Sequence, residues 1–222
     1  MITKQELKEQ MLKDGISLFG VADVSGIKGH FVLTEEITKD LNRAVVLGYR
    51  LSQKVLDSLV DKPSPMYYFH YQRANVFLDS SILKVAELIQ RDGYQALPIP
   101  ASQMIDWENM RGTVSHREIA ELAGLGWRGK NNLTVSPLYG SQVRYITLLT
   151  NMPLEADKPL AENCGACRLC ARVCPAEAIS DSPEKFDSGK CRIQLRKFEK
   201  IQFIGTMICG LCVKACKGKG NI

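Results

Sequence analysis

The sequence has no apolar run long enough to cross a membrane, and this absence is the first limit on its function. A transmembrane helix needs about 20 predominantly apolar residues. The first residues, MITKQELKEQMLKDG, are charged and amphipathic, unlike an export signal. The apolar fraction of 45% is that of an ordinary globular protein. These features predict a soluble cytoplasmic protein with no membrane partner.

Cysteine is absent from residues 1–163, whereas the remaining 59 residues hold all eight cysteines. Disulfides are typical of small secreted domains, and this chain has no export signal. Cysteines that are close in sequence would also gain little from loop closure. A disulfide framework is therefore disfavoured.

The first four cysteines have a spacing with a specific meaning. The pattern Cys164-x2-Cys167-x2-Cys170-x3-Cys174-Pro175 is that of bacterial ferredoxins, in which the fourth cysteine ligates the other cluster. Zinc, which usually takes two separated pairs of ligands, is the weaker alternative. The spacing predicts two 4Fe–4S clusters.

Because the fourth cysteine ligates the other cluster, the spacing also predicts which cysteines share a cluster. Three cysteines of the first group need one distant partner, and Cys174 needs three. The symmetric solution assigns Cys164, Cys167, Cys170 and Cys216 to cluster 1, and Cys174, Cys191, Cys209 and Cys212 to cluster 2.

Positive charge is concentrated in the same part of the chain. Residues 164–222 hold 11 basic and 5 acidic side chains, whereas residues 1–163 hold 18 and 19. Two oxidised clusters with their thiolates would carry about −2 each, which offsets most of this excess. We interpret the basic segment as charge compensation; the alternative is a docking face for RNA or an acidic redox partner.

Helices and strands alternate before the cysteines, which predicts an α/β fold. Thr3 and Glu6, and later Ser115 and Glu118, form capping-box patterns at helix starts. Helices are predicted over 5–14, 34–42, 67–93 and 116–124, and strands over 16–24, 44–51, 94–100 and 142–150. With 151–163 as a link, the predicted domains are 1–158 and 159–222.

The stretch AGLGWRGKNNLTV, residues 123–135, imitates two phosphate-binding motifs without satisfying either. It closes a helix rather than following a strand, and Asn131 stands where a phosphate loop needs Ser or Thr. Its excess of glycine predicts a backbone that approaches a flat cofactor, and the alternative is a tight turn. For Trp127 the alternative is a core anchor, and for Lys130 a surface lysine. The predicted contacts are Gly124, Gly126, Trp127, Gly129, Lys130 and Asn131.

The segments HREIAELAGLGWRGKNNL, YGSQV and CGACRLCARVCP together resemble the epoxyqueuosine reductase family. Its members are cobalamin-dependent iron–sulfur enzymes of tRNA queuosine modification, related to reductive dehalogenases. The resemblance implies a nitroreductase-like sheet domain followed by a ferredoxin-like domain with two clusters ligated as above. It also implies a base-off corrinoid, and no D-x-H-x-x-G motif surrounds any of the three histidines.

The chain departs from the family at its proton donor and its carboxyl end. An ungapped comparison places Met110 where the family has an aspartate, with Asp106 and Glu108 nearby. Asp106 is therefore a candidate acid, and His116 is a second candidate whose alternative is a solvated side chain. The chain stops at Ile222 without the family's C-terminal helical repeats. We therefore disfavour epoxyqueuosine in tRNA as the substrate and nucleic acid as a partner.

Together these features predict an iron–sulfur oxidoreductase. Electrons would pass from an external ferredoxin- or flavodoxin-type donor through two 4Fe–4S clusters to a corrinoid or another cofactor that reduces a small-molecule substrate. The alternatives are an electron-transfer protein without substrate chemistry and a zinc-stapled structural or RNA-binding protein. The apolar segment 203–208, FIGTMI, is predicted to pack beneath the clusters; the alternative is that it lines a cofactor pocket.

Overall fold

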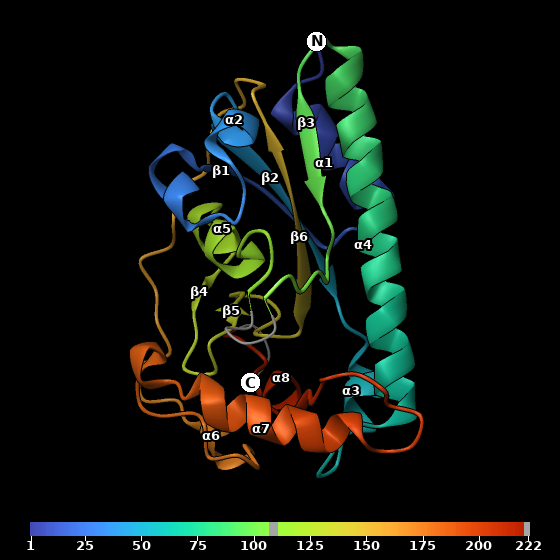
Figure 1. Ribbon diagram of the computed structural model, residues 1–222, viewed down its shortest axis with the longest axis vertical. Coiled ribbons are helices and arrows are strands. Elements are labelled where there is room, and N and C mark those ends of the chain that lie inside the picture. Colours follow the sequence, from blue (N-terminus) through green and yellow to red (C-terminus); the bar gives the residue numbers. More distant parts are fainter. Residues whose placement is uncertain (107–110, 220–222) are drawn as a thin grey trace. The chain divides into compact units, whose positions relative to one another are not determined.

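The computed structural model describes residues 1–106 and 111–219, which form two compact units, each assembled from separate stretches of sequence (Figure 1). The sheet unit takes its described residues from 1–49, 75–125 and 144–160. The cysteine unit takes them from 50–74, 126–143 and 161–222.

These units differ from the continuous division that the sequence predicts. The last change between them, at residues 160 and 161, lies close to the predicted boundary. Two earlier stretches, 50–74 and 126–143, belong with the cysteines instead, because their residues pack among the cysteine-bearing loops. The division into domains 1–158 and 159–222 stays a prediction.

The first helix begins and ends as its sequence predicts. In α1 (Lys4–Lys13) the Thr3 hydroxyl accepts from the Glu6 backbone N–H, and the Glu6 carboxylate accepts from Thr3 N. Gly15 follows the helix with φ of 96°, a conformation that favours glycine. The chain then enters the first strand.

A four-stranded sheet in the order β1-β2-β6-β3 forms the centre of the sheet unit among the described residues. β1 runs antiparallel to β2 with Leu18 opposite Gly48, and β3 antiparallel to β6 with Ala96 opposite Thr150. The strands are β1 (Leu18–Asp23), β2 (Arg43–Arg50), β3 (Ala96–Ile99) and β6 (Val143–Thr150). All four predicted strands are confirmed, with ends shifted by up to two residues.

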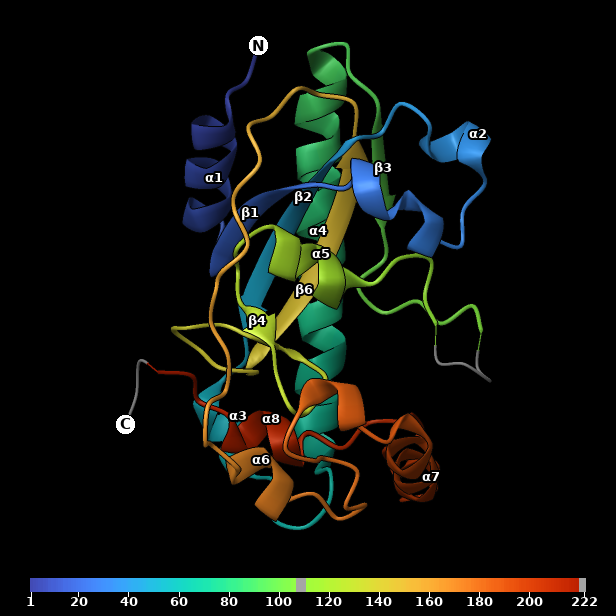
Figure 2. The same cartoon turned by 90° about the vertical axis from the view of Figure 1, so that its left-hand side faces the viewer.

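One face of this sheet is covered by α1 and by the later part of α4 (Pro65–Arg91), as Figures 1 and 2 show. Alternate strand residues point to this face because side chains of a strand alternate in direction. The buried core includes Leu7, Met11, Val21, Val45, Leu47, Leu78, Ile82, Val85, Ile89, Ile146 and Leu148.

The opposite face is covered by α5 (His116–Leu122), which packs against β1 (Figure 2). Ser115 caps this helix by accepting from Glu118 N. A Cβ at Gly20 of β1 would lie 2.7 Å from the Ala123 carbonyl oxygen, so the glycine permits the close approach. The sheet unit also contains the 3₁₀ segment η1 (Ser25–His30) and the short α2 (Glu35–Thr38).

The cysteine unit consists of short helices, a small hairpin and loops. α8 (Leu211–Ala215) contacts both α3 (Gln53–Asp57) and α6 (Leu169–Arg172). The hairpin pairs β4 (Trp127–Arg128) with β5 (Thr134–Val135). The other elements are the 3₁₀ turn η2 (Pro183–Lys185) and α7 (Ser188–Glu199). No helix in the described chain is both long enough and apolar enough to cross a bilayer.

Candidate metal centre

All eight cysteines are described and none is in a disulfide. Within residues 1–106 and 111–219, no three Cys, His, Asp or Glu side chains converge as they would around a single metal ion. The thiols are nevertheless close enough for the charge of one to shift the pKa of another.

The first group of neighbouring thiols surrounds Cys170, which is buried. Burial, together with the smaller effects of the nearby Cys216, Cys164 and Cys167, raises the pKa of Cys170 to about 11. Cys216 therefore lies beside three cysteines that precede it by more than 40 positions. The backbone between Cys164 and Cys167 also closes a turn, with Cys167 N donating to Cys164 O at 3.1 Å.

The second group centres on Cys212. Burial raises its pKa well above the usual value, with further increases from Cys209, Cys191, Cys170 and Cys174. Burial also raises the pKa of Cys209 to about 11, and that of Cys191, with Cys174 adding to both. Apart from the link between Cys212 and Cys170, the interactions fall into two sets of four.

These two sets have the donor chemistry of two 4Fe–4S cubes. Each set offers four thiols, and an iron–sulfur cube takes four cysteine thiolates. Buried thiols that raise one another's pKa are poorly placed to ionise without a cation, and coordinated iron supplies that positive charge. The sets also match the predicted assignment, whose cluster ligation stays a prediction.

Lys130 joins the glycine-rich hairpin to the first cysteine loop. Its side chain is 7% exposed, and its Nζ donates to the carbonyl oxygens of Gly165 at 2.8 Å and Cys167 at 3.0 Å. The ammonium group therefore holds the loop between two cysteines of the first set. Lys130 is therefore not a surface lysine, while its predicted contact with a cofactor stays a prediction.

Trp127 contacts the same loop from β4. Its indole Nε1 donates to Cys164 Sγ at 3.5 Å, and its ring lies 5.3 Å from Lys219 Nζ. The residue is buried, so it is both a core anchor and a donor to a cysteine sulfur. Hydrogen bonds to the sulfurs are among the factors that set the potential of an iron–sulfur cluster.

Replacing Trp127 with Phe is expected to make the potential of the first cluster more negative, because the ring remains while the N–H donor is lost. An anaerobic redox titration followed by electron paramagnetic resonance would measure both clusters. The second cluster is the internal control, because the indole N–H donates to Cys164, a cysteine of the first set. An unchanged first potential would contradict this role of the indole.

The segment YGSQV, residues 139–143, contacts the backbone at Lys214 and Cys216. Ser141 N donates to Cys216 O at 3.2 Å, and Gln142 Nε2 donates to Lys214 O at 3.0 Å. A Cβ at Gly140 would lie 2.1 Å from Cys216 O. These three residues were not among the predicted site residues, although the segment was part of the family resemblance.

The remaining predicted cofactor contacts are engaged within the protein. Gly126 and Gly129 leave no room for a Cβ against Val135, which lies on the other strand of their hairpin. Asn131 is buried and donates to Ser141 Oγ at 2.9 Å. The close approach that the glycines allow is thus to protein backbone and side chains, while their predicted contact with a flat cofactor stays a prediction.

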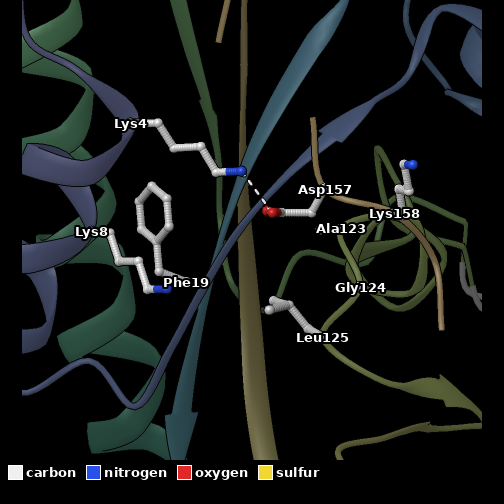
Figure 3. A pocket seen from close by; sticks show the side chains of 8 residues that line it. All are labelled: Lys4, Lys8, Phe19, Ala123, Gly124, Leu125, Asp157 and Lys158. Carbon is white, nitrogen blue, oxygen red and sulfur yellow. Dashed lines mark hydrogen bonds and ion pairs between the residues drawn. The ribbon is translucent and has the colours of Figure 1, made fainter. Parts of the chain in front are cut away.

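Gly124 has a comparable role in the sheet unit, at a small pocket of about 240 Å³ (Figure 3). With φ of 67°, it approaches the segment after β6 so closely that a Cβ would lie 2.5 Å from Lys158 O. Asp157 fixes this segment, because its carboxylate accepts from Lys4 Nζ at 2.6 Å and from Val21 N at 2.9 Å. No cysteine is among the residues that line this pocket, which are Lys4, Lys8, Phe19, Ala123, Gly124, Leu125, Asp157 and Lys158.

Asp106, the first candidate acid, is half-buried beside the end of the described segment. Its backbone pairs with Arg111, with Arg111 N donating to Asp106 O at 2.9 Å. Glu108 and Met110, which bear on the predicted proton donor, lie outside the described residues. The role of Asp106 stays a prediction.

His116, the second candidate, is held by hydrogen bonds rather than freely solvated, so that alternative is wrong. Its Nε2 lies 2.9 Å from the Pro100 carbonyl oxygen, which can only accept, and its Nδ1 lies 2.9 Å from Thr147 Oγ1. Burial lowers the pKa of His116 to about 4, and nearby Arg144 also lowers it. His116 is therefore neutral at pH 7 and supplies no acidic imidazolium there, while its catalytic role stays untested.

The lowered pKa of His116 predicts a loss of stability in acid. The unfolded chain takes up this proton near pH 6.5 and the folded chain only near 4, so protonation favours unfolding as the pH falls through this interval. We expect His116 to cost on the order of 2 kcal/mol between pH 7.5 and 4.5. Urea unfolding of the wild type and of His116→Gln at several pH values would measure the difference; parallel pH dependences would contradict it.

We compared the sequence of the chain with those of known proteins. No protein-family model matches the chain. It is 32% identical to an epoxyqueuosine reductase of Bacillus cereus over 167 residues, which is 67% of this chain and 43% of that protein. It is 30% identical to a tetrachloroethene reductive dehalogenase of Sulfurospirillum multivorans over 152 residues, which is 62% of this chain and 28% of that protein.

A solved structure shares the fold. A reductive dehalogenase whose structure suggests a mechanism for B12-dependent dehalogenation matches 96% of this chain and 31% of its own, with a TM-score of 0.71 and 21% identity. This similarity confirms the predicted α/β fold. The chain spans less than half the length of the curated relatives named above.

Proposed function

Because the chain belongs to the epoxyqueuosine reductase family, we propose that it is an oxidoreductase that carries electrons through two 4Fe–4S clusters to a substrate-reducing cofactor. The relatives are reductases, which supports a redox enzyme. The observation that carries the proposal is the gathering of eight thiols into two sets of four, one of which includes the distant Cys216.

The bound groups would supply the redox chemistry. Each cluster, when bound, stores and passes one electron at a time, and a corrinoid would deliver electrons to an organic substrate. The residues that would hold the first cluster are Cys164, Cys167, Cys170 and Cys216, and those for the second are Cys174, Cys191, Cys209 and Cys212.

The protein's own groups prepare these loops for binding. Lys130 fixes two carbonyls of the first loop, and Trp127 directs an N–H at Cys164. Near the second set, Ala178 N donates to Cys174 Sγ at 3.4 Å. Buried Phe198, Ile204, Ile208 and Leu211 exclude water from the surrounding core. Because these contacts are formed before any electron moves, little rearrangement is needed on reduction.

An electron-transfer protein without substrate chemistry is the second candidate function. It is favoured by one observation: the glycine-rich segment is engaged in contacts within the protein rather than open to a flat cofactor. In either case the external donor is a ferredoxin- or flavodoxin-type protein. A small molecule is the proposed substrate of the enzyme, since the family's aspartate position corresponds to Met110 in this chain.

Purification under anaerobic conditions, followed by metal analysis and absorption spectroscopy, separates these functions. About eight irons per chain with a corrinoid band and stoichiometric cobalt support the enzyme. Iron without cobalt or another chromophore supports the electron carrier. Zinc with no visible absorption contradicts both. Incubation of the reduced protein with tRNA that contains epoxyqueuosine is expected to give no product, and conversion to queuosine would overturn the proposed small-molecule substrate.

A further inference from the structure

Helix α7 has two chemically distinct sides. Cys191 and Phe198 lie seven residues apart on the same side, where Phe198 is buried and Cys191 half-buried. The opposite side is exposed and carries four basic residues around one apolar residue. This basic face consists of Lys190, Ile193, Arg196, Lys197 and Lys200.

The cations of the basic face have no ion-pair partner within the described part of the chain. None of its four cations forms an ion pair there, whereas Arg168 on a neighbouring loop pairs with Asp181 at 3.2 Å. The single acidic residue of α7, Glu199, is also exposed and offsets only one of these charges. Cys191, which would ligate the second cluster, lies on the opposite side of the helix, so these four cations face solvent rather than the cluster. For these residues the arrangement favours the docking-face alternative over charge compensation.

Apolar side chains lie within and beside this positive surface. Ile193, at the centre of the basic face, is 59% exposed, and Phe203, just beyond the end of α7, is 73% exposed. The sequence predicted that segment 203–208 would pack beneath the clusters. Ile204 and Ile208 are buried, whereas Phe203, whose φ of 69° lies in a turn, is exposed to solvent. An apolar centre with a charged rim is typical of a protein–protein interface.

We propose that the basic face of α7 is the docking site for an acidic one-electron carrier protein that reduces the second cluster. The inference rests on the proposed function and adds the position of electron entry. An α-helix with its side chains is about 10–12 Å across. A carrier bound to this face therefore sits one helix width from Cys191, on the far side of the same helix.

The electron transfer is balanced without protons. A reduced two-iron ferredoxin loses one electron and returns to its oxidised state, while one oxidised 4Fe–4S cluster gains that electron. Acidic carriers match the four cations, and opposite charges speed the encounter of two proteins at low salt. RNA would also be attracted to these cations, but the position of Cys191 directly behind the face favours an electron donor.

The test compares reduction by a protein with reduction by a small molecule. The holoprotein variant Lys190→Glu/Arg196→Glu/Lys197→Glu is mixed anaerobically with a reduced, acidic plant-type ferredoxin, and cluster bleaching is followed by stopped flow. The matched control is Lys8→Glu/Lys54→Glu/Lys62→Glu, which reverses the same number of exposed charges elsewhere. Ferredoxin affinity is measured separately by calorimetry at several salt concentrations.

We expect the triple variant on α7 to be reduced by ferredoxin at least tenfold more slowly, with weaker binding and a flatter salt dependence, while dithionite reduces it at the wild-type rate. Ile193→Ser should weaken binding without changing the salt dependence. Unchanged reduction of the triple variant by ferredoxin would overturn the docking site. So would loss of binding to an RNA stem-loop with ferredoxin unaffected. Failure of dithionite to reduce the wild type would instead refute the proposed function.

Discussion

Replacing Cys216 with Ala is expected to remove the cluster held by Cys164, Cys167 and Cys170 and to leave the other cluster in place. Cys216 is the distant member of the set around Cys170, so its loss leaves that set with three thiols. The iron content should fall from about eight to about four per chain, since each cube contains four irons. Iron analysis with Mössbauer spectroscopy of anaerobic protein measures this directly.

The matched control is Cys212→Ala, which removes a member of the second set that follows Cys209 by only three residues. It should affect the second cluster, so the two variants should lose spectroscopically different halves of the iron. If Cys216→Ala lost the cluster that contains Cys191, the crossed assignment would be wrong. A colourless wild type after reconstitution would remove the basis for both clusters.

Gly140→Ala is expected to have the second largest effect, although Gly140 has no functional group. Its φ of 58° is strained for alanine, which costs about 1–2 kcal/mol. The new Cβ would also lie 2.1 Å from Cys216 O and 2.4 Å from Gly218 N. Both are backbone atoms, so the chain at Cys216 must move, at a further cost of about 1–3 kcal/mol or more. We expect lower stability and partial loss of the first cluster, measured by thermal unfolding and iron analysis.

Gly205→Ala is the control that separates the cost of the backbone conformation from the cost of the steric clash at Gly140. Gly205 has nearly the same φ, 57°, but a Cβ there would meet nothing within 4 Å. This variant should show only the cost of the backbone conformation and keep all of its iron. If both glycine variants retained equal iron, the contact between the loop of Gly140 and Cys216 would not support the cluster site.

The sequence predicts the cysteine grouping because ligand spacing constrains a cluster locally. Three cysteines in seven residues can surround one cube, and the fourth must come from another segment. The helix starts at Thr3 and Ser115 were also predictable, since capping depends on residues three positions apart. These features need no knowledge of tertiary structure.

The roles of Lys130 and the glycines were not predictable in the same way. Lys130 binds backbone carbonyls 35 and 37 positions away, and such acceptors leave no mark in the sequence. Glycine excess at 124–129 indicates a close approach but not what is approached, which proves to be Lys158 and Val135. The exposure of Phe203 likewise depends on a local turn rather than on the apolar character of its segment.

The loop of Gly140 has a consequence for how the protein is made. During synthesis this loop leaves the ribosome before the segment that contains Cys216. The two segments are joined by hydrogen bonds from Ser141 N to Cys216 O and from Lys219 N to Pro137 O. A nascent chain interrupted before that point would display three cysteines of the first set with no fourth. Iron delivery to this set should therefore wait until Cys216 has been synthesised, and fragments released before that point would be poor recipients of iron.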